Sequence, residues 1–414
     1  MTLKIWRGGI LLVLVLLQAC SFGSKEVKPS PKPPVKVVVT EGQAPIEKGK
    51  KLLAKQLALQ DAIRQASIQA GAEVTSQTML NQSVIQSDAV SFHAAAQVTH
   101  TQILNEWALD NVYYVRAQIS LSTNSTCVPH YRKRILATAF PLAEQSQVSG
   151  AETQDLAGGI PREINNQLME SKEFIGFNAT HVSLYGQPRL APEFYDDAPY
   201  QVSGVMQLAN NNGAQIVLSG VIRDLQIESG DYIRGSGPTA MFNSFYRDFW
   251  SRRGIGIDVY LHDGFTGALL FQYRYTDAVE GDVWLPPTYT VGSERFNATP
   301  TGEKISKIIT LASQDIRRSL ACYPFATRIN KIEKNKIYID AGAQDNVRAG
   351  DQLIIYTDAS DEFKLEGNRH YLDHDKRPAG VLTINDVKPR YAVGTFEVDP
   401  LSQGVRIGDW VRSW

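Results

Sequence analysis

The spacing of apolar residues changes twice along the chain, and this decides which kind of fold each part can adopt. One β-branched strand and a helical spacing come first, strands and helices alternate next, and only strands follow after about residue 322. Helices and strands bury apolar residues at periods of about 3.6 and 2 residues. A chain of 414 residues is long enough for roughly two or three domains with their own cores. The sequence therefore predicts an α+β multidomain protein.

Residues 1–20 have the features of an export signal peptide. Lys4 and Arg7 precede an apolar run at 10–17, which is too short to span a bilayer as a helix, since that takes about 20 residues. The run ends in Leu-Gln-Ala followed by Cys20, an arrangement that resembles a bacterial lipobox. This resemblance predicts that lipid is attached to Cys20.

Two forms of the mature N-terminus are consistent with these residues. In lipoproteins the lipidated cysteine becomes the first residue, and Ser21 after it implies anchoring to the outer membrane. The alternative is ordinary cleavage after Ala19 or near Gly23, which gives a soluble periplasmic protein. Mass spectrometry of the mature N-terminus distinguishes the two.

Residues 21–35 are predicted to be a proline-rich linker. The stretch Lys-Pro-Ser-Pro-Lys-Pro-Pro at 28–34 favours polyproline II and cannot build a core. Folded domains are predicted at 36–126, 127–322 and 323–414.

The first domain, 36–126, is predicted to be a small α/β unit. A β-branched strand at 37–40 precedes a helix at 46–70, and strand-rich segments follow at 89–104 and 112–121. One helix on a small antiparallel sheet is the simplest packing. The apolar face of the helix is predicted to consist of Leu52, Leu59, Ile63, Ala66 and Ala70.

The middle domain, 127–322, is predicted to be a mixed sheet with helices on its faces. Buried strands are predicted at 134–140 and 216–222, and a hairpin turns at Asp263-Gly264. A strand at 174–180 and a short helix at 201–212 complete the alternation. Two longer helices carry apolar stripes: Leu156, Ile160, Ile164 and Leu168 in one, and Ile305, Ile308, Ile309, Ala312, Ile316 and Leu320 in the other.

The third domain, 323–414, is predicted to be all β. Gly350-Asp351 and Gly408-Asp409 each precede a strand, which predicts two similar corners of a small barrel, SH3-like in size. The polar stretch 358–378 is predicted to be a long exposed loop. It contains His370 and His374, which could bind a metal if the segment were helical, although a solvated loop is the simpler interpretation.

Five aromatic residues of the middle domain recur at helical spacing and are accompanied by arginines. As one stripe they either cover the domain's own sheet or form a contact with a partner or another subunit. They are Phe242, Phe245, Tyr246, Phe249 and Trp250.

Cys127 and Cys322 flank the middle domain. Domain termini often lie close together, the exported compartment is oxidising, and lipidation or processing removes Cys20 from consideration. We therefore predict a disulfide between Cys127 and Cys322, with two buried free thiols as the alternative. A non-reducing peptide map tests this pairing.

Signs of enzymatic or nucleic-acid chemistry are missing from the sequence. The 42 Lys and Arg residues are balanced by 43 Asp and Glu, which argues against a general nucleic-acid-binding protein. No dinucleotide, phosphate-loop, serine-hydrolase or His-Glu-x-x-His motif occurs. We predict no catalytic residues, no cofactor and no metal site.

The order of these patterns behind an export signal resembles the flagellar assembly protein T (FlgT) family. The resemblance rests on Val39-Thr-Glu-Gly-Gln-Ala44, Ile135-Leu-Ala-Thr-Ala-Phe140, Ile216-Val-Leu-Ser-Gly220 and the two Gly-Asp corners. The middle part is also similar to the N-terminal domain of TolB and to CsgG-type lipoproteins.

The resemblance implies a structural role and not an enzymatic one. Members of the family are periplasmic components of the H ring of the flagellar basal body, which supports the T ring of MotX and MotY and stator assembly. This implies self-association in a ring. Two other functions fit the residues: an outer-membrane lipoprotein binding module or scaffold of the cell envelope unrelated to motility, and an envelope hydrolase.

Overall fold

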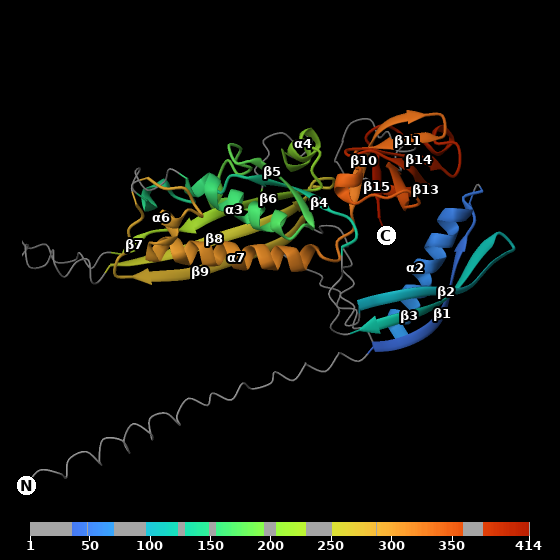
Figure 1. Ribbon diagram of the computed structural model, residues 1–414, viewed down its shortest axis with the longest axis horizontal. Coiled ribbons are helices and arrows are strands. Elements are labelled where there is room, and N and C mark those ends of the chain that lie inside the picture. Colours follow the sequence, from blue (N-terminus) through green and yellow to red (C-terminus); the bar gives the residue numbers. More distant parts are fainter. Residues whose placement is uncertain are drawn as a thin grey trace, which may run out of the picture.

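The computed structural model describes residues 35–47, 49–69, 97–122, 129–148, 155–193, 204–228, 251–286, 288–358 and 376–413. Within them the strands form three separate sheets: one of three strands, one of six strands, and a closed barrel. Figure 1 shows the first beside its helix, the second with helices against it, and the barrel at the C-terminal end of the chain. The predicted α+β multidomain architecture is confirmed.

The N-terminal domain is one helix on a three-stranded antiparallel sheet, as predicted. Strands β1 (Val35–Pro45), β3 (Val112–Ser122) and β2 (Gln97–Leu109) lie in that order, and helix α2 (Lys51–Gln69) packs on one face. The helix begins at Lys51 rather than at residue 46 because β1 continues to Pro45. Residues 89–96 of the predicted strand segment lie outside the described part.

The face that α2 buries differs from the prediction. Its centre is a row of alanines four residues apart, Ala54, Ala58, Ala62 and Ala66, while Leu52, Leu59 and Ile63 are only half-buried. Gly42 of β1 explains why the alanine row is the buried face, since a Cβ atom at Gly42 would lie 2.1 Å from the backbone oxygen of Ala58. Small residues face each other because the helix backbone lies against the strand. Of the predicted face, only Ala66 is at the centre, and Ala70 is outside the described residues.

The middle domain is built on a mixed sheet, as predicted. The order is β5-β4-β6-β8-β7, with β9 paired to β8; β4 is parallel to β5 and β6, and the other pairs are antiparallel. The strands are β4 (Lys133–Thr138), β5 (Phe174–Ala179), β6 (Ile216–Asp224), β7 (Ile227–Glu228), β8 (Arg252–Asp263) and β9 (Leu269–Glu280).

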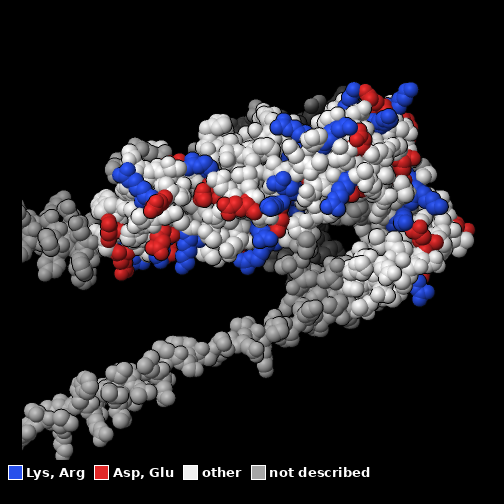
Figure 2. Space-filling view, in the orientation of Figure 1, with Lys and Arg blue, Asp and Glu red and all other residues white. Residues whose placement is uncertain are grey.

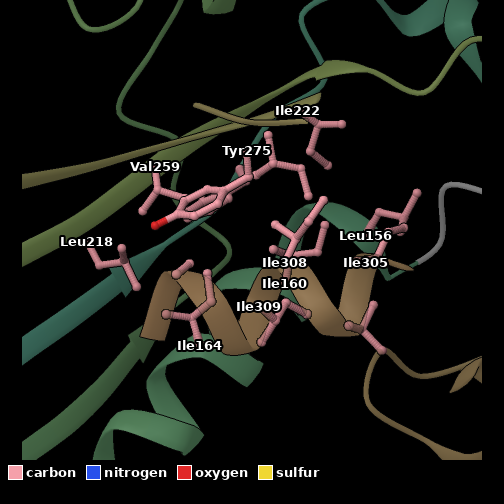
Figure 3. Close-up of a cluster of buried hydrophobic side chains, with 14 of the residues drawn as sticks. Leu156, Ile160, Ile164, Leu218, Ile222, Val259, Tyr275, Ile305, Ile308 and Ile309 are labelled. Atoms are coloured by element: carbon pink, nitrogen blue, oxygen red, sulfur yellow. The ribbon is translucent and has the colours of Figure 1, made fainter. Parts of the chain in front are cut away.

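Helices α3 (Leu156–Glu170) and α7 (Pro300–Leu320) cover one face of this sheet (Figure 1). Figure 3 shows Tyr275 and Val259 of the sheet facing the isoleucines of both helices. All ten predicted stripe residues are buried. Helix α4 (Gly204–Asn211) packs on the opposite face, where Val205 and Ala209 contact Val217, and the short helix α6 (Glu294–Asn297) precedes α7.

Pro161 lies in the second turn of α3, where its missing N–H leaves the carbonyl of Ala157 without its helical donor. The backbone N–H of Phe140, just after β4, donates to that carbonyl at 2.8 Å. The carbonyl that the proline leaves free thus bonds the helix to the segment after the strand that the helix covers.

The C-terminal domain is a closed barrel of six strands in the order β10-β11-β14-β13-β12-β15. They are β10 (Ala326–Glu333), β11 (Lys336–Ile339), β12 (Gln352–Asp358), β13 (Lys376–Val387), β14 (Ala392–Phe396) and β15 (Trp410–Arg412). The predicted exposed loop at 358–378 is partly wrong, because Lys376–Pro378 already pair with β12. The short 3-10 helices are η1 (Gln145–Gln147), η2 (Pro188–Leu190), η3 (Ala343–Asp345) and η4 (Leu401–Gln403).

The two Gly-Asp corners of the barrel have the same geometry. Gly350 and Gly408 have φ angles of 93° and 92°, which glycine adopts without strain. The carboxylates of Asp351 and Asp409 each accept the N–H of the residue three positions earlier at 2.8 Å. One corner leads into β12 and the other into its neighbour β15.

Candidate assembly surfaces

Charged residues join the middle domain to the barrel. Arg134 of β4 donates from Nε and Nη2 to the two carboxylate oxygens of Asp345 at 2.8 and 3.1 Å, and from Nη1 to Asp340 at 3.0 Å. Asp345 is fully buried and also accepts the N–H of Gly342. Burial lowers the pKa of Arg134, but its hydrogen bonds and charge interactions with Asp345 and Asp340 outweigh burial, so that the pKa is raised. This joint therefore holds a permanently charged guanidinium.

An apolar cluster reinforces the same joint. Phe265, in the turn after β8, packs edge-on against Trp410 of β15 with ring centroids 4.9 Å apart. The guanidinium of Arg328 lies over the ring of Phe265, 4.7 Å from its centroid. Tyr323 donates its hydroxyl to Asp263 at 2.8 Å. The middle domain and the barrel are thus joined by two adjacent sets of contacts, one charged and one largely aromatic.

The N-terminal domain meets the barrel through the first turns of α2. The backbone N–H of Leu52 donates to Oε2 of Glu397, which follows β14, at 3.0 Å, and the N–H of Leu53 also donates to this carboxylate. The other oxygen of Glu397 accepts the N–H of Val381 at 2.8 Å. Glu397 therefore acts as the N-cap of a helix 345 positions away in sequence.

Apolar and amide contacts surround this cap. Leu53 of α2 is buried against Ile354 and Val381 of the barrel, and Gln56 donates its side-chain amide to Gln352 at 2.8 Å. Burial raises the pKa of Glu397, and the backbone N–H groups only partly offset this. We call this set of contacts, Leu52, Leu53, Gln56, Gln352, Ile354, Val381 and Glu397, the latch.

Replacing Glu397 with alanine should loosen the start of α2 without unfolding the barrel. The loss of an N-cap costs about 1 kcal/mol, so amide exchange of the first turn of α2 should accelerate roughly fivefold. Hydrogen-exchange mass spectrometry of peptides over 51–57 measures this. Glu333→Ala on the exposed end of β10 is the matched control and should leave these peptides unchanged. Unchanged protection of 51–57 in Glu397→Ala would contradict the capping role.

The N-terminal sheet has a second face that no described element covers. Residues on it include Val37 (54% exposed) and Leu109 (59% exposed), and Trp107 stacks on Tyr114 with centroids 5.4 Å apart and planes 4° apart. Figure 2 shows few charged side chains on this domain in that view. Exposed apolar area of this kind is typical of protein contacts, so we regard this sheet face as a candidate assembly surface.

A buried polar network lies on the far side of the middle sheet. Asp258 of β8, 2% exposed, accepts from Arg223 Nε at 2.6 Å, from Arg274 Nε at 2.5 Å and from the Tyr260 hydroxyl at 2.9 Å. Burial raises the pKa of Asp258, but the hydrogen bonds from Arg274, Arg223 and Tyr260 outweigh it and the pKa is lowered. Asp258 is therefore an ionised structural anchor at neutral pH.

Arg223 links Asp258 to the loop around η2. Its Nη atoms donate to the carbonyls of Pro188, Arg189 and Ala191 at 2.7–3.0 Å. Beside it, the Tyr185 hydroxyl contacts Ser219 Oγ at 2.9 Å and His262 Nε2 at 3.1 Å. Burial lowers the pKa of His262 to about 4, so the imidazole is neutral at pH 7. These groups hold a loop on the sheet, and we assign them a packing role.

The site residues predicted from sequence lie mostly outside the described residues. This is true of Cys20, Cys127, the aromatic stripe (Phe242, Phe245, Tyr246, Phe249 and Trp250), and of His370 and His374. Cys322, directly after α7, is disulfide-bonded. Its pairing with Cys127 stays a prediction.

The sequence patterns predict neither the latch nor the Arg134 joint. One signal was available for the latch: the residues before α2, Glu-Lys-Gly-Lys at 47–50, include none of the usual capping residues Ser, Thr, Asp or Asn. The first N–H groups of such a helix are left to water or to an acceptor from another segment, and nothing in the sequence singles out Glu397. The charges of the Arg134 joint resemble ordinary surface charges in the sequence.

Two features are absent from the part of the chain that the structure describes. No group of three or more His, Cys, Asp or Glu side chains there could hold a metal ion. Among the helices in those ranges, none is both long and apolar enough to cross a membrane.

The fold and these surfaces define a multidomain protein whose barrel contacts both other domains and whose N-terminal sheet has one face, with several exposed apolar side chains, that no described element covers. Two family profiles give the family: flagellar assembly protein T, N-terminal domain, matches residues 36–123, and flagellar assembly protein T, middle domain, matches residues 125–291. The chain belongs to the flagellar assembly protein T family, which is a family of structural flagellar assembly proteins. A search of curated proteins finds no significant match.

Several solved structures share a low similarity with part of the chain. A hypothetical protein from Chlamydia trachomatis is 14% identical over 46% of this chain and 98% of its own, with a TM-score of 0.30. The PelC dodecamer from Paraburkholderia phytofirmans is 13% identical over 48% and 94%, with a TM-score of 0.26. A lipoprotein from Neisseria meningitidis is 14% identical over 44% and 97%, with a TM-score of 0.23. These low scores support no statement about function.

Proposed function

We propose that this protein is a structural component of the H ring of the flagellar basal body, in the periplasm, where it is needed for ring formation and stator assembly. The observation that carries the proposal is the match of two family profiles over most of 36–291. The export signal at 1–20 supports the compartment. The partners are further copies of the chain and the T-ring proteins MotX and MotY.

The structural basis of this function is the arrangement of the three domains. The barrel, which we propose to be SH3-like, contacts both other domains, while the open face of the N-terminal sheet is available for a neighbour. Many modest contacts repeated around a closed ring give a stable assembly. The middle domain, which we propose to be TolB-like, and the aromatic stripe at 242–250 supply further candidate contacts.

Three sequence features belong to the same proposal. We place the boundaries of the linker and domains at 21–35, 36–126, 127–322 and 323–414. A disulfide from Cys127 to Cys322 would join the two ends of the middle domain, where the neighbouring domains attach. Lipid on Cys20 would anchor the ring to the outer membrane.

An in-frame deletion tests the function. Cells without the protein should lose swimming, and purified basal bodies should lack ring density under the electron microscope, while envelope integrity is kept. Re-expression of the full chain should restore both. Normal swimming with intact motors would refute the proposal, and detergent sensitivity with normal motility would instead favour an envelope lipoprotein, the alternative suggested by Cys20.

A further inference from the structure

Helix α4 ends in a turn that contains the one Asn-Gly pair of the sequence, Asn212-Gly213. The N–H of Ala214 donates to the carbonyl of Ala209 at 2.9 Å, and the N–H of Gly213 donates to that of Asn210 at 3.3 Å. These two bonds, with a φ angle of 60° at Gly213, form a Schellman motif. The glycine is therefore present because it closes the helix in the left-handed conformation.

The side-chain amide of Asn212 lies next to a main-chain nitrogen that is weakly held. Asn212 is exposed, and its Nδ2 donates to the carbonyl of Leu208 at 2.9 Å. The bond from the N–H of Gly213 is longer than the usual range. Gly213 has no Cβ that would shield the Cγ of Asn212 from this nitrogen. The attacking nitrogen and the carbon that it would attack are thus neighbours without steric protection.

This arrangement favours deamidation, which needs only water as a co-reactant. The main-chain nitrogen of Gly213 bonds to Cγ of Asn212 and closes a five-membered succinimide. The Cγ–Nδ2 bond breaks, and Nδ2 leaves as ammonia with the proton of the Gly213 N–H. Water then opens one of the two ring carbonyls. Opening at Cγ gives aspartate, and opening at the main-chain carbonyl gives isoaspartate.

The turn lies against the charged joint between the middle domain and the barrel. A Cβ atom on Gly213 would lie 3.0 Å from Oδ2 of Asp340 and 3.4 Å from Nη1 of Arg134, the two atoms of their ion pair. The N–H of Gln215 donates to the main-chain carbonyl of Arg134 at 3.0 Å. Figure 1 shows α4 at the end of the middle domain that faces the barrel. A change in the main chain of this turn therefore displaces atoms at the joint.

Both products disturb the turn, and isoaspartate disturbs it more. Each adds a negative charge at the C-terminal end of α4, where the helix dipole disfavours it. Isoaspartate also lengthens the main chain by one methylene, since the chain then runs through the former side chain. The Schellman bonds are broken by this insertion, and Gly213 moves relative to Asp340. Arg134 keeps its bonds to the fully buried Asp345, so the joint loosens without separating.

We propose that Asn212 is a site of spontaneous deamidation, and that its conversion to isoaspartate loosens the joint between the middle domain and the barrel. The inference does not depend on the proposed ring function, because it uses only residues of this chain and water. It makes the joint depend on the age of the protein, since the modified chains accumulate and the lost amide is not restored.

Ageing of the purified full-length chain tests the site. Incubation at mildly alkaline pH promotes loss of the proton from the attacking nitrogen. Peptide mapping should then find a gain of about 1 Da at Asn212, and electron-transfer fragmentation should identify isoaspartate there. Asn210 and Asn211 are internal controls, because an asparagine with a Cβ follows each of them. No gain at Asn212, or an equal gain at all three, would overturn the site.

Hydrogen exchange measures the effect on the joint. The N–H of Arg132 donates to the carbonyl of Asp345 across it, so peptides over 129–133 and 340–347 should exchange severalfold faster in the aged protein. Peptides over 305–320 of α7 should keep their protection. Unchanged exchange over 129–133 and 340–347 in protein that carries isoaspartate would overturn the effect on the joint.

Asn212→Gln separates this modification from other effects of ageing. The variant keeps a side-chain amide, but its longer side chain would have to close a six-membered ring, which is much slower. Fresh Asn212→Gln should match the fresh native chain, and the aged variant should keep both its amide and the protection of 340–347. The same increase in exchange in the aged variant would show that residue 212 is not the cause.

Discussion

The variant Asp258→Asn should lose about 3 kcal/mol or more of the stability of the middle domain, since removing one partner of a buried ion pair has effects of this size. The amide presents an NH₂ group or one neutral oxygen to Arg223 and Arg274, so Arg223, with its side chain only 18% exposed, keeps a buried charge without a counter-charge. The loop at η2 should loosen as well, because the guanidinium that Asp258 orients also donates to three carbonyls of this loop. Urea unfolding at pH 7 measures the loss.

The effect of this substitution should depend on pH. The pKa of Asp258 is lowered in the folded protein, so its contribution to stability is complete above its ordinary pKa of about 4 and is lost as the pH falls through the lower folded value. The difference in stability between the native chain and Asp258→Asn should therefore be constant from pH 7 to about 5 and shrink in stronger acid.

Asp277→Asn is a matched control on the neighbouring strand β9. Asp277 pairs with Lys304 at 3.1 Å, and the two side chains are 26% and 38% exposed. Solvent screens such a pair, so we expect a loss of at most about 1 kcal/mol. Equal losses in the two variants would show that the buried network has no special role.

Gly42→Ala should unfold the N-terminal domain. The added methyl would lie 2.1 Å from the oxygen of Ala58 and 2.3 Å from the nitrogen of Ala62, and both are backbone atoms that cannot move without moving α2. The helix would have to leave the sheet, and overpacking alone costs about 1–3 kcal/mol. Hydrogen exchange over 51–69 and 112–122 should rise to the rate of an unfolded chain, while the barrel and the middle domain keep their protection.

Gly49→Ala provides the comparison within the same domain. Its φ angle is 77° and no atom lies within 4 Å of the position of a Cβ, so only backbone strain of about 1 kcal/mol is expected. If Gly42→Ala were no worse than this control, the close contact between α2 and β1 would be wrong.

Local patterns predicted much of this fold. The stripes of α3 and α7 and the two Gly-Asp corners depend on neighbours in sequence, and all of them are found where expected. The prediction of the buried face of α2 was wrong because this face depends on a residue of another element. The close approach at Gly42 has room for the row of alanines but not for the larger Leu52, Leu59 and Ile63. The spacing of apolar residues shows which faces of a helix could be buried. The shape of the opposing strand decides which of these faces is buried.

Contacts between domains were the least predictable part. Arg134 and Asp345 are 211 positions apart, and Leu52 and Glu397 are 345 apart. The sequence around a charged residue does not show whether that residue joins two domains or lies in solvent. The absence of a capping residue before α2 leaves its first N–H groups to water or to a distant acceptor. Only the three-dimensional arrangement identifies Glu397 as that acceptor.

The barrel closes through β15, which pairs with β10 on one side and β12 on the other. Until residues 410–412 have been synthesised, β10 and β12 each keep an edge without its partner strand. The cap for α2 and the acceptor of Arg134 both lie on this barrel. The contacts that orient both other domains therefore depend on a barrel that only the last residues of the chain can close.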